Sequence, residues 1–185
     1  MQAYERCPPD IVKSVQQRWL FTCWTRLRNG ASLPRYAEFT RDKIEDCRDD
    51  LSILDVEAHD AAHRFRIFDH GRNVGAMYAS QCAGKYLDEV LPVAARAHTL
   101  ETYEHAVRSR MPIYTVSRIT DADDRPILYE RLLLPLGDAN GRVVRILALL
   151  ETISSEGTIA RRSLMTDPAP GNRYIIKAEL HAPAA

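Results

Sequence analysis

The sequence contains no apolar run long enough to span a bilayer, so we expect no membrane helix. The first ten residues, MQAYERCPPD, lack the apolar core that a secretory signal needs. The four cysteines are scattered and none belongs to a C-x-x-C pair, which argues against a metal knuckle or a redox pair. Free thiols without a secretory signal are typical of the reducing cytoplasm, so we expect a cytoplasmic protein.

An excess of charge of either sign is also absent. Lys and Arg together number 25, as do Asp and Glu, and the pI is about 7.0. Such a chain has no general field that attracts nucleic acid or an anionic membrane, so we expect neither as a partner. No G-x-S-x-G, H-E-x-x-H or P-loop motif occurs. The carboxylate pairs Asp49-Asp50 and Asp123-Asp124 are best explained as solvated, and the sequence favours a protein that is not an enzyme.

The composition is that of a globular protein, with 45% hydrophobic and 27% charged residues. From residue 11 to residue 29, apolar residues recur every three or four positions, which predicts a helix that Asp10 caps and Gly30 ends. This stripe carries both tryptophans. Two interpretations stay open, because the stripe suits packing on its own domain and equally suits a homodimer through residues 11–29.

The rest of the chain predicts an α+β fold. The expected elements are a short helix (42–50), two strands (51–58 and 63–70), short helical turns (71–90), a longer helix (92–110) and three strands (113–120, 127–136 and 142–153). The expected buried stripe of the longer helix is Val93, Ala97, Leu100, Tyr103 and Val107. An Asn-Gly pair joins the last two strands as a hairpin. Sequential hairpins imply an antiparallel sheet with the helices on one side.

Three regions follow from this order. We expect an N-terminal helix and linker over 1–40, the main domain over 41–153, and a tail over 154–185, in which residues 173–180 either add one strand or stay loose.

Several short motifs carry a resemblance to a known family. They are Trp24, Arg28, Pro34, Leu54-Asp55-Val56, the Arg-Phe-Arg-Ile of 64–67, Gly84-Lys85-Tyr86-Leu87 and the segment Tyr129–Leu136. With these motifs and its order of elements, the chain resembles the PAS domains, and in particular a family of small, often single-domain bacterial PAS proteins of mostly unknown function. The resemblance implies a five-stranded antiparallel sheet with helices on one face. It also implies a sensory or interaction module in bacterial signalling that binds a small ligand or a partner protein.

One pair of residues departs from this family. Its members tend to carry Gly-Thr after the second strand, where this chain has Asp69-His70, and Gly71 follows one place late. We expect a shifted turn that alters the wall of the usual cavity.

The resemblance also places candidate ligand-binding residues between the sheet and the helices, namely Tyr78, Tyr103, His105, Tyr129 and Arg131. An Arg131 that faces inward needs an anion, either Asp55, Glu151 or a ligand carboxylate. We favour an Arg131 that faces outward or is ion-paired.

No cofactor motif is evident. In some heme-binding PAS modules a histidine of the long helix ligates iron, so His98 or His105 would be the ligand, but surface or hydrogen-bonded histidines are the favoured explanation. His59 and His63 have metal-like spacing without a third ligand, and no metal site is predicted. Cys82 lacks the Asn-Cys-Arg-Phe-like context of the flavin photosensors, and a small buried residue is expected there.

Two other functions stay open. One is an enzyme on the cone-shaped α+β fold of ketosteroid-isomerase relatives, with Asp55, His105 and Tyr129 as its candidates. The other is a structural dimerisation module built on residues 11–29.

Overall fold

The computed structural model describes residues 3–78, 81–120, 126–153 and 173–181. The strands are β1 (Glu5–Cys7), β2 (Leu51–His59), β3 (Ala62–His70), β4 (Ile113–Thr120), β5 (Pro126–Gly137), β6 (Val143–Ile153) and β7 (Arg173–Leu180). The α-helices are α1 (Val15–Arg28), α2 (Arg41–Ile44), α3 (Arg72–Met77), α4 (Leu87–Val90) and α5 (Val93–Ser109). Short 3-10 helices lie at Pro9–Ile11, Tyr36–Glu38 and Glu45–Asp50.

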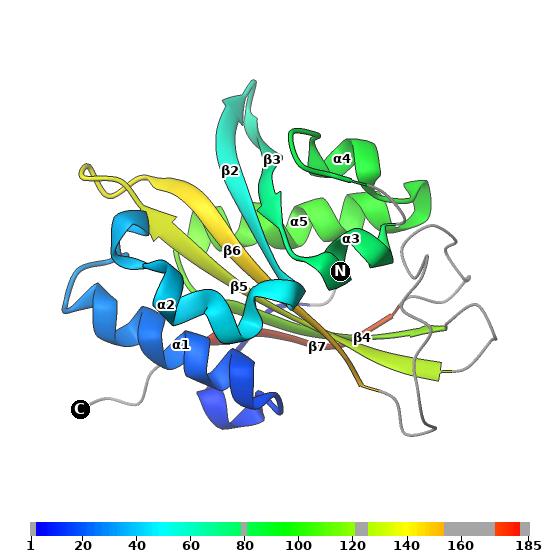
Figure 1. The fold of residues 1–185 in the computed structure, drawn as a ribbon, viewed down its shortest axis with the longest axis horizontal. Helices are drawn as coiled ribbons and strands as arrows, with labels where there is room; N and C mark the ends of the chain where they lie inside the picture. The colour runs from blue at the N-terminus through cyan, green and yellow to red at the C-terminus, as the bar shows by residue number, and fades with distance from the viewer. Residues whose placement is uncertain (1–2, 79–80, 121–125, 154–172, 182–185) are drawn as a thin grey trace.

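The strands form one seven-stranded sheet in the order β1-β7-β4-β5-β6-β2-β3 (Figure 1). The five strands predicted from the sequence are confirmed, and residues 173–180 add a strand, but the expected five-stranded antiparallel sheet is wrong. Strand β7 extends the sheet beyond β4, and β1 pairs with β7 in parallel. A three-residue strand with the sequence Glu-Arg-Cys has no alternation to reveal it, and only its long-range pairing makes it a strand.

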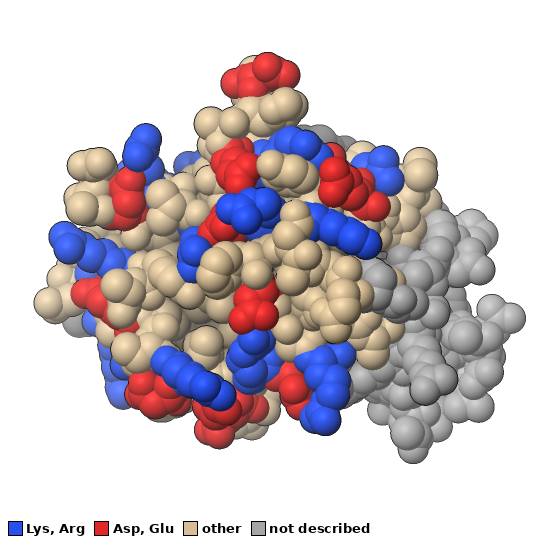
Figure 2. Space-filling model, turned by 45° about the horizontal axis from the view of Figure 1, so that its top comes forward, with Lys and Arg blue, Asp and Glu red and all other residues tan. Residues whose placement is uncertain are grey.

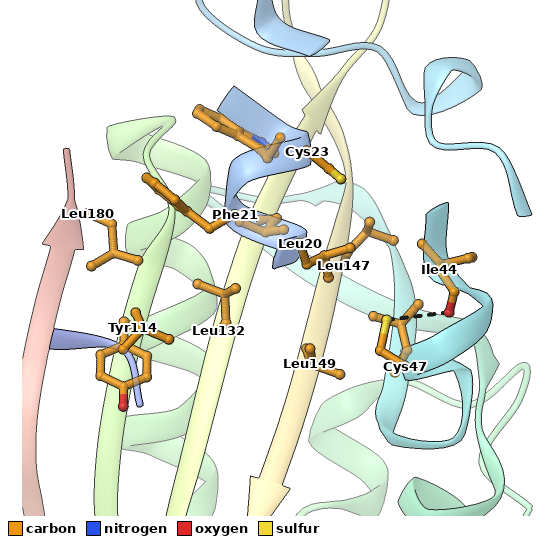
Figure 3. Close-up of a cluster of buried hydrophobic side chains, with 14 of the residues drawn as sticks. Leu20, Phe21, Cys23, Ile44, Cys47, Tyr114, Leu132, Leu147, Leu149 and Leu180 are labelled. Atoms are coloured by element: carbon orange, nitrogen blue, oxygen red, sulfur yellow. Dashed lines mark hydrogen bonds between the residues drawn. The ribbon is translucent and has the colours of Figure 1, made fainter. Parts of the chain in front are cut away.

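Helices cover both faces of the sheet, which corrects the expectation of helices on one face (Figure 1). On one face, α1 and α2 pack on β4, β5 and β6, and Figure 3 shows Leu20, Phe21 and Cys23 of α1 pointing onto these strands. On the other face, α3, α4 and α5 pack against a second buried cluster that contains Phe65, Tyr103 and Leu133. The sheet is therefore the middle of three layers.

Helix α1 begins at Val15 and not at residue 11. Ser14 is its N-cap and accepts a hydrogen bond from the Gln17 amide at 3.1 Å, so the predicted Asp10 cap is wrong. Residues Pro9–Ile11 form a separate 3-10 turn, because Val12 after them is extended. The stripe packs on its own sheet: Trp24 is 2% exposed and its Nε1 donates to the Pro135 carbonyl at 2.8 Å, whereas Trp19 is 50% exposed.

The expected helix over 42–50 is split. Its first turn is α2, and Glu45–Asp50 continues it as a 3-10 helix that leads directly into β2. The predicted β5–β6 turn is confirmed, and Asp138 Oδ1 accepts hydrogen bonds there from the amides of Asn140 and Arg142. Strands β2 and β3 also form a hairpin, in which His59 pairs with Ala62.

Helix α5 confirms the predicted long helix, but it is rotated from the predicted stripe. Its buried residues are Ala95, Thr99, Thr102, Tyr103 and Ala106, whereas Val93 is 80% exposed. Only Tyr103 belongs to both sets. The apolar residues of this helix are too evenly spread to define its face, and two threonines point toward the sheet instead.

Candidate functional site

The layer between the sheet and α5 contains a buried arginine. Arg131 lies in the middle of β5 and is 5% exposed. Its strand neighbours on the same face, Tyr129 and Leu133, belong to the cluster that α5 covers, so alternation places Arg131 beneath α5. The expectation of an Arg131 that faces outward is therefore wrong. The sheet has a core on each face, and a strand buried on both sides leaves no solvent side for an arginine.

Neither carboxylate proposed as a partner reaches Arg131. Asp55 accepts hydrogen bonds from Arg66 at 2.8 Å and from Arg145 at 2.7 Å. Glu151 accepts from the Ser14 hydroxyl at the start of α1, on the opposite face of the sheet. Among the residues that the structure describes, no carboxylate forms an ion pair with Arg131. The ketosteroid-isomerase-like alternative needs Asp55, His105 and Tyr129 in one site. Asp55 is bound by the two arginines Arg66 and Arg145, whereas Tyr129 and His105 lie in the layer between the sheet and α5, so the three residues do not form one site.

Three tyrosines surround the guanidinium group of Arg131. Its Cζ lies 5.2 Å from the ring centre of Tyr129 on β5 and 5.7 Å from that of Tyr103 on α5. Tyr78 follows α3 in the same buried cluster, and its pKa is affected by both other tyrosines and by Arg131. Burial raises the pKa of all three phenols, although the positive charge of Arg131 lowers it, so they are neutral hydroxyl groups at physiological pH. Four of the five predicted site residues therefore lie together.

A second buried cation lies in the same row of the sheet. Thr115 on β4 pairs with Arg131 on one side and with Lys177 of β7 on the other. Thr115 is 1% exposed and Lys177 is 5% exposed. The Lys177 Nζ lies 4.3 Å from the ring centre of Tyr4 and 5.3 Å from that of Tyr174. The row Lys177–Thr115–Arg131 thus places two cations on either side of a hydroxyl group.

A β-bulge makes this arrangement. The pairing of β4 with β7 shifts between Val116 and Ser117, so that Ser117 lies opposite Tyr174 while Thr115 lies opposite Lys177. Strict alternation would put Tyr174 and Lys177 on opposite faces of β7. Sequence reasoning missed Thr115, Lys177, Tyr174 and Tyr4, and no sequence pattern could have found them, because a bulge in an irregular eight-residue strand leaves no local signal.

Several polar atoms of this layer are buried without a hydrogen-bond partner in the described part of the chain. They are Arg131 Nε and Nη1, Tyr129 Oη, Thr152 Oγ1 and Tyr4 Oη. Tyr129 and Thr152 are directly opposed on β5 and β6. Buried polar groups are normally paired, so these atoms without a described partner make the layer the candidate site.

Comparison with known protein families shows to which family the chain belongs. A family model described as PAS domain matches residues 12–151, which is most of the chain. The chain belongs to the PAS domain family. The matched segment includes α1, the helices α3, α4 and α5, and the strands from β2 to most of β6, but neither β1 nor β7. The expected family resemblance is confirmed.

Solved structures with the PAS fold are similar at low identity. The blue-light photoreceptor Aureochrome1 LOV is 12% identical with a TM-score of 0.42, over 64% of this chain and 91% of that chain. The LOV protein of Rhodobacter sphaeroides is 15% identical with a TM-score of 0.44, over 64% of this chain and 71% of that chain. VqmA of Vibrio cholerae is 10% identical with a TM-score of 0.45, over 63% of this chain and 52% of that chain. No curated protein matches the chain.

The two histidines that a heme-binding PAS domain would offer from α5 already contact other side chains. His105 Nε2 lies 2.8 Å from Glu179 Oε1, and its ring stacks on Tyr4 with the ring centres 3.7 Å apart. His105, the fifth predicted site residue, therefore lies beside Tyr4, the ring that Lys177 also contacts, and not among the tyrosines around Arg131. The ring of His98 lies edge-on to Tyr174, and burial, together with the charges of Arg131 and Lys177, lowers the pKa of His98. An iron ligand at either position would have to break these contacts.

The departure at Asp69-His70 has a structural role. Asp69 forms an ion pair with Arg48, and His70 accepts a hydrogen bond from the Cys82 amide at 3.1 Å through Nε2. Cys82 itself is fully buried in the α5-side cluster, as expected. His70 thereby links Cys82, which precedes α4, to the end of β3.

The remaining candidate sites give no metal centre. His63 contacts Glu104 at 3.0 Å, His59 contacts Asp60, and no group of three metal-ligating residues occurs in the described part of the chain. Basic and acidic side chains interleave over the face shown in Figure 2. Within the described residues, no helix has the length and apolar character that crossing a membrane requires.

Proposed function

We propose that this PAS domain is a non-enzymatic sensory module that binds a small molecule between its sheet and α5 and signals through a partner protein. The observation that carries the proposal is the group of buried polar atoms on Tyr129, Arg131 and Thr152 that have no described hydrogen-bond partner. Such groups normally have partners, and ligand sites are mostly apolar with a few converging polar groups, as this layer is.

The site is suited to transmit binding. Arg131 and Tyr129 belong to the central strand β5, whose other face packs on α1 through Leu132 and Leu134. A ligand that orders the α5 layer therefore acts on the strand that carries α1. This is how a change beneath α5 would reach the outer surface of the N-terminal helix.

The small-molecule part is tested on the freshly purified protein. We expect heat or acid denaturation to release a small molecule that mass spectrometry detects, and its re-addition to raise the melting temperature of the stripped protein. The absorption spectrum of the same sample tests the cofactor question, because a heme or a flavin would each give its own visible band. A protein that releases nothing, and that no metabolite stabilises, would leave only the partner-binding part of the proposal.

The partner part includes a homodimer through residues 11–29. The apolar stripe of α1 is used by its own sheet, and Val15 and Trp19 remain outside it with exposed fractions of 73% and 50%. Light scattering of the full chain and of Trp19→Ser tests the dimer. We expect a dimer that the substitution weakens, and a monomeric wild-type protein at micromolar concentration would exclude it.

A further inference from the structure

We propose that the molecule bound beneath α5 is a small organic carboxylate whose anionic group is held by Arg131, with Thr115 and Lys177 beside it. This inference rests on the proposed function and names its ligand class. Two observations support it: the buried layer contains two cations, and hydrogen-bond donors of Arg131 have no acceptor among the described residues.

The buried layer has an excess of positive charge. Arg131 and Lys177 are both at least nine-tenths buried, and neither has an ion-pair partner among the described residues. A buried charge is costly unless it is paired, and attraction to tyrosine rings recovers only a part of that cost. Glu179, a carboxylate of β7, is already in contact with His105 and His181.

The donors also suit a carboxylate. Arg131 Nε and Nη1 and the hydroxyl group of Tyr129 have no partner in hydrogen-bond geometry among the described residues, although Arg131 lies close enough to Tyr129 to lower the pKa of its phenol. Guanidinium groups never accept hydrogen bonds, so a partner of Arg131 must supply lone pairs. A planar guanidinium matches a planar carboxylate in geometry, and a charge-assisted hydrogen bond is roughly twice as strong as a neutral one.

The surroundings favour an organic acid over a free inorganic ion. Side chains of Phe65, Tyr103, Leu133 and Leu150 belong to the same cluster as Tyr129, so the region around the donors is aromatic and aliphatic. An apolar or aromatic group attached to the carboxylate would replace water there. A ligand with both parts would use the cation and the apolar surface together.

Matched neutral and anionic probes test the inference on the full chain. Benzoate and hexanoate are compared with benzamide and hexanamide in thermal unfolding and in isothermal titration. We expect the two acids to raise the melting temperature and the two amides to have no effect. We expect Arg131→Met to weaken benzoate binding by about tenfold to a hundredfold, the effect of losing hydrogen bonds to a charged group. Arg118→Met, which removes an exposed arginine of β4, is the control and should bind benzoate like the wild type.

The stability of the ligand-free variants gives a second readout. Because Arg131→Met removes a buried charge that lacks a partner, its melting temperature without ligand should equal or exceed that of the wild type. Equal responses to acids and amides would overturn the inference and leave a neutral small-molecule site. A response to phenyl phosphate in preference to benzoate would overturn the carboxylate assignment. If no probe of either charge acts and Arg131→Met lowers the melting temperature, Arg131 is a structural cation, and the small-molecule part of the proposed function fails as well.

Discussion

Glu130 and Glu151 are directly opposed on strands β5 and β6, on the sheet face that α1 covers. Glu130 is 2% exposed, and its Oε2 has no hydrogen-bond partner in the described part of the chain. Burial raises the pKa of Glu130, and the charge of Glu151 adds to this, whereas Tyr114 and Lys13 oppose it. The hydroxyl group of Ser14, the N-cap of α1, donates a hydrogen bond to Glu151, the residue opposite Glu130. The start of α1 therefore lies beside a buried carboxyl group whose ionised form is unfavourable.

The first prediction is that Glu130→Gln stabilises the protein above neutral pH. A carboxyl group with a raised folded-state pKa holds its proton longer in the folded state, so the free energy of unfolding falls as pH rises through that pKa. The substitution removes this loss. We expect a gain on the order of 1 kcal/mol at pH 8, which disappears as the pH approaches the ordinary value for glutamate.

Urea unfolding of both proteins across this pH range measures the effect. The exposed residue Glu5 supplies the control, since Glu5→Gln should leave the pH dependence unchanged. A Glu130→Gln variant that is less stable than the wild type at pH 8 would show that the ionised carboxylate is stabilising.

The two tryptophans of α1 should differ sharply in their contribution to stability. Trp24 is buried and donates a hydrogen bond to the Pro135 carbonyl at 2.8 Å, whereas half of Trp19 is exposed. We expect Trp24→Ala to cost about 3–5 kcal/mol, because it leaves a cavity between α1 and β5 and an unpaired carbonyl. Trp19→Ala should change the free energy of unfolding by about 0.5 kcal/mol or less. Chemical denaturation of the two variants measures both values, and equal losses would contradict the packing of α1 described above.

Gly71 is required because the backbone of Arg48 and Asp49 approaches it closely. A methyl group added there would overlap the carbonyl oxygens of Arg48 and Asp49, and the Gly71 amide donates to the Leu51 carbonyl at 2.8 Å. Backbone atoms cannot move aside as a flexible side chain can. We expect Gly71→Ala to destabilise the protein by about 2 kcal/mol or more.

Gly84 serves as the matched comparison for Gly71. It has a φ of +85° and open space around it, so Gly84→Asn, which tolerates this backbone region, should cost less than about 1 kcal/mol. The melting temperatures of the two variants test the contrast. A Gly71→Ala variant as stable as Gly84→Asn would mean that the junction between β3 and α3 moves readily.

His105 should stabilise the N-terminal strand and not the ligand. Its ring stacks on Tyr4, two residues before Arg6 of β1, and its Nε2 contacts Glu179 of β7, the strand that β1 pairs with. We expect His105→Phe to keep the stack and to lose the polar contact, at a cost of about 1 kcal/mol. Hydrogen exchange of the Glu5–Cys7 amides should become faster. Benzoate binding should stay unchanged, and its loss would place His105 in the ligand site.

Local patterns predicted most of the elements of this fold. Period-two alternation and short β-branched runs indicated the strands, and the Asn-Gly pair identified the β5–β6 turn, because these signals depend on neighbouring residues. The same alternation places Tyr129 and Arg131 on one face of β5, and these are two of the four candidate residues that lie together. These features are properties of the chain over distances of a few residues.

Tertiary structure decided on which side those residues lie. The sheet is covered on both faces, so hydrophobicity does not distinguish the α5 face of β5 from the α1 face, and the direction of Arg131 does not follow from its strand. The bulge between β4 and β7 brings Lys177 and Tyr174 to one face, and the pairing partners of Asp55 and Glu151 keep both acids away from Arg131. The sequence by itself determined a PAS-like order of elements and a shared face of β5. The long-range contacts between strands decided that the buried layer contains two cations without a described carboxylate partner.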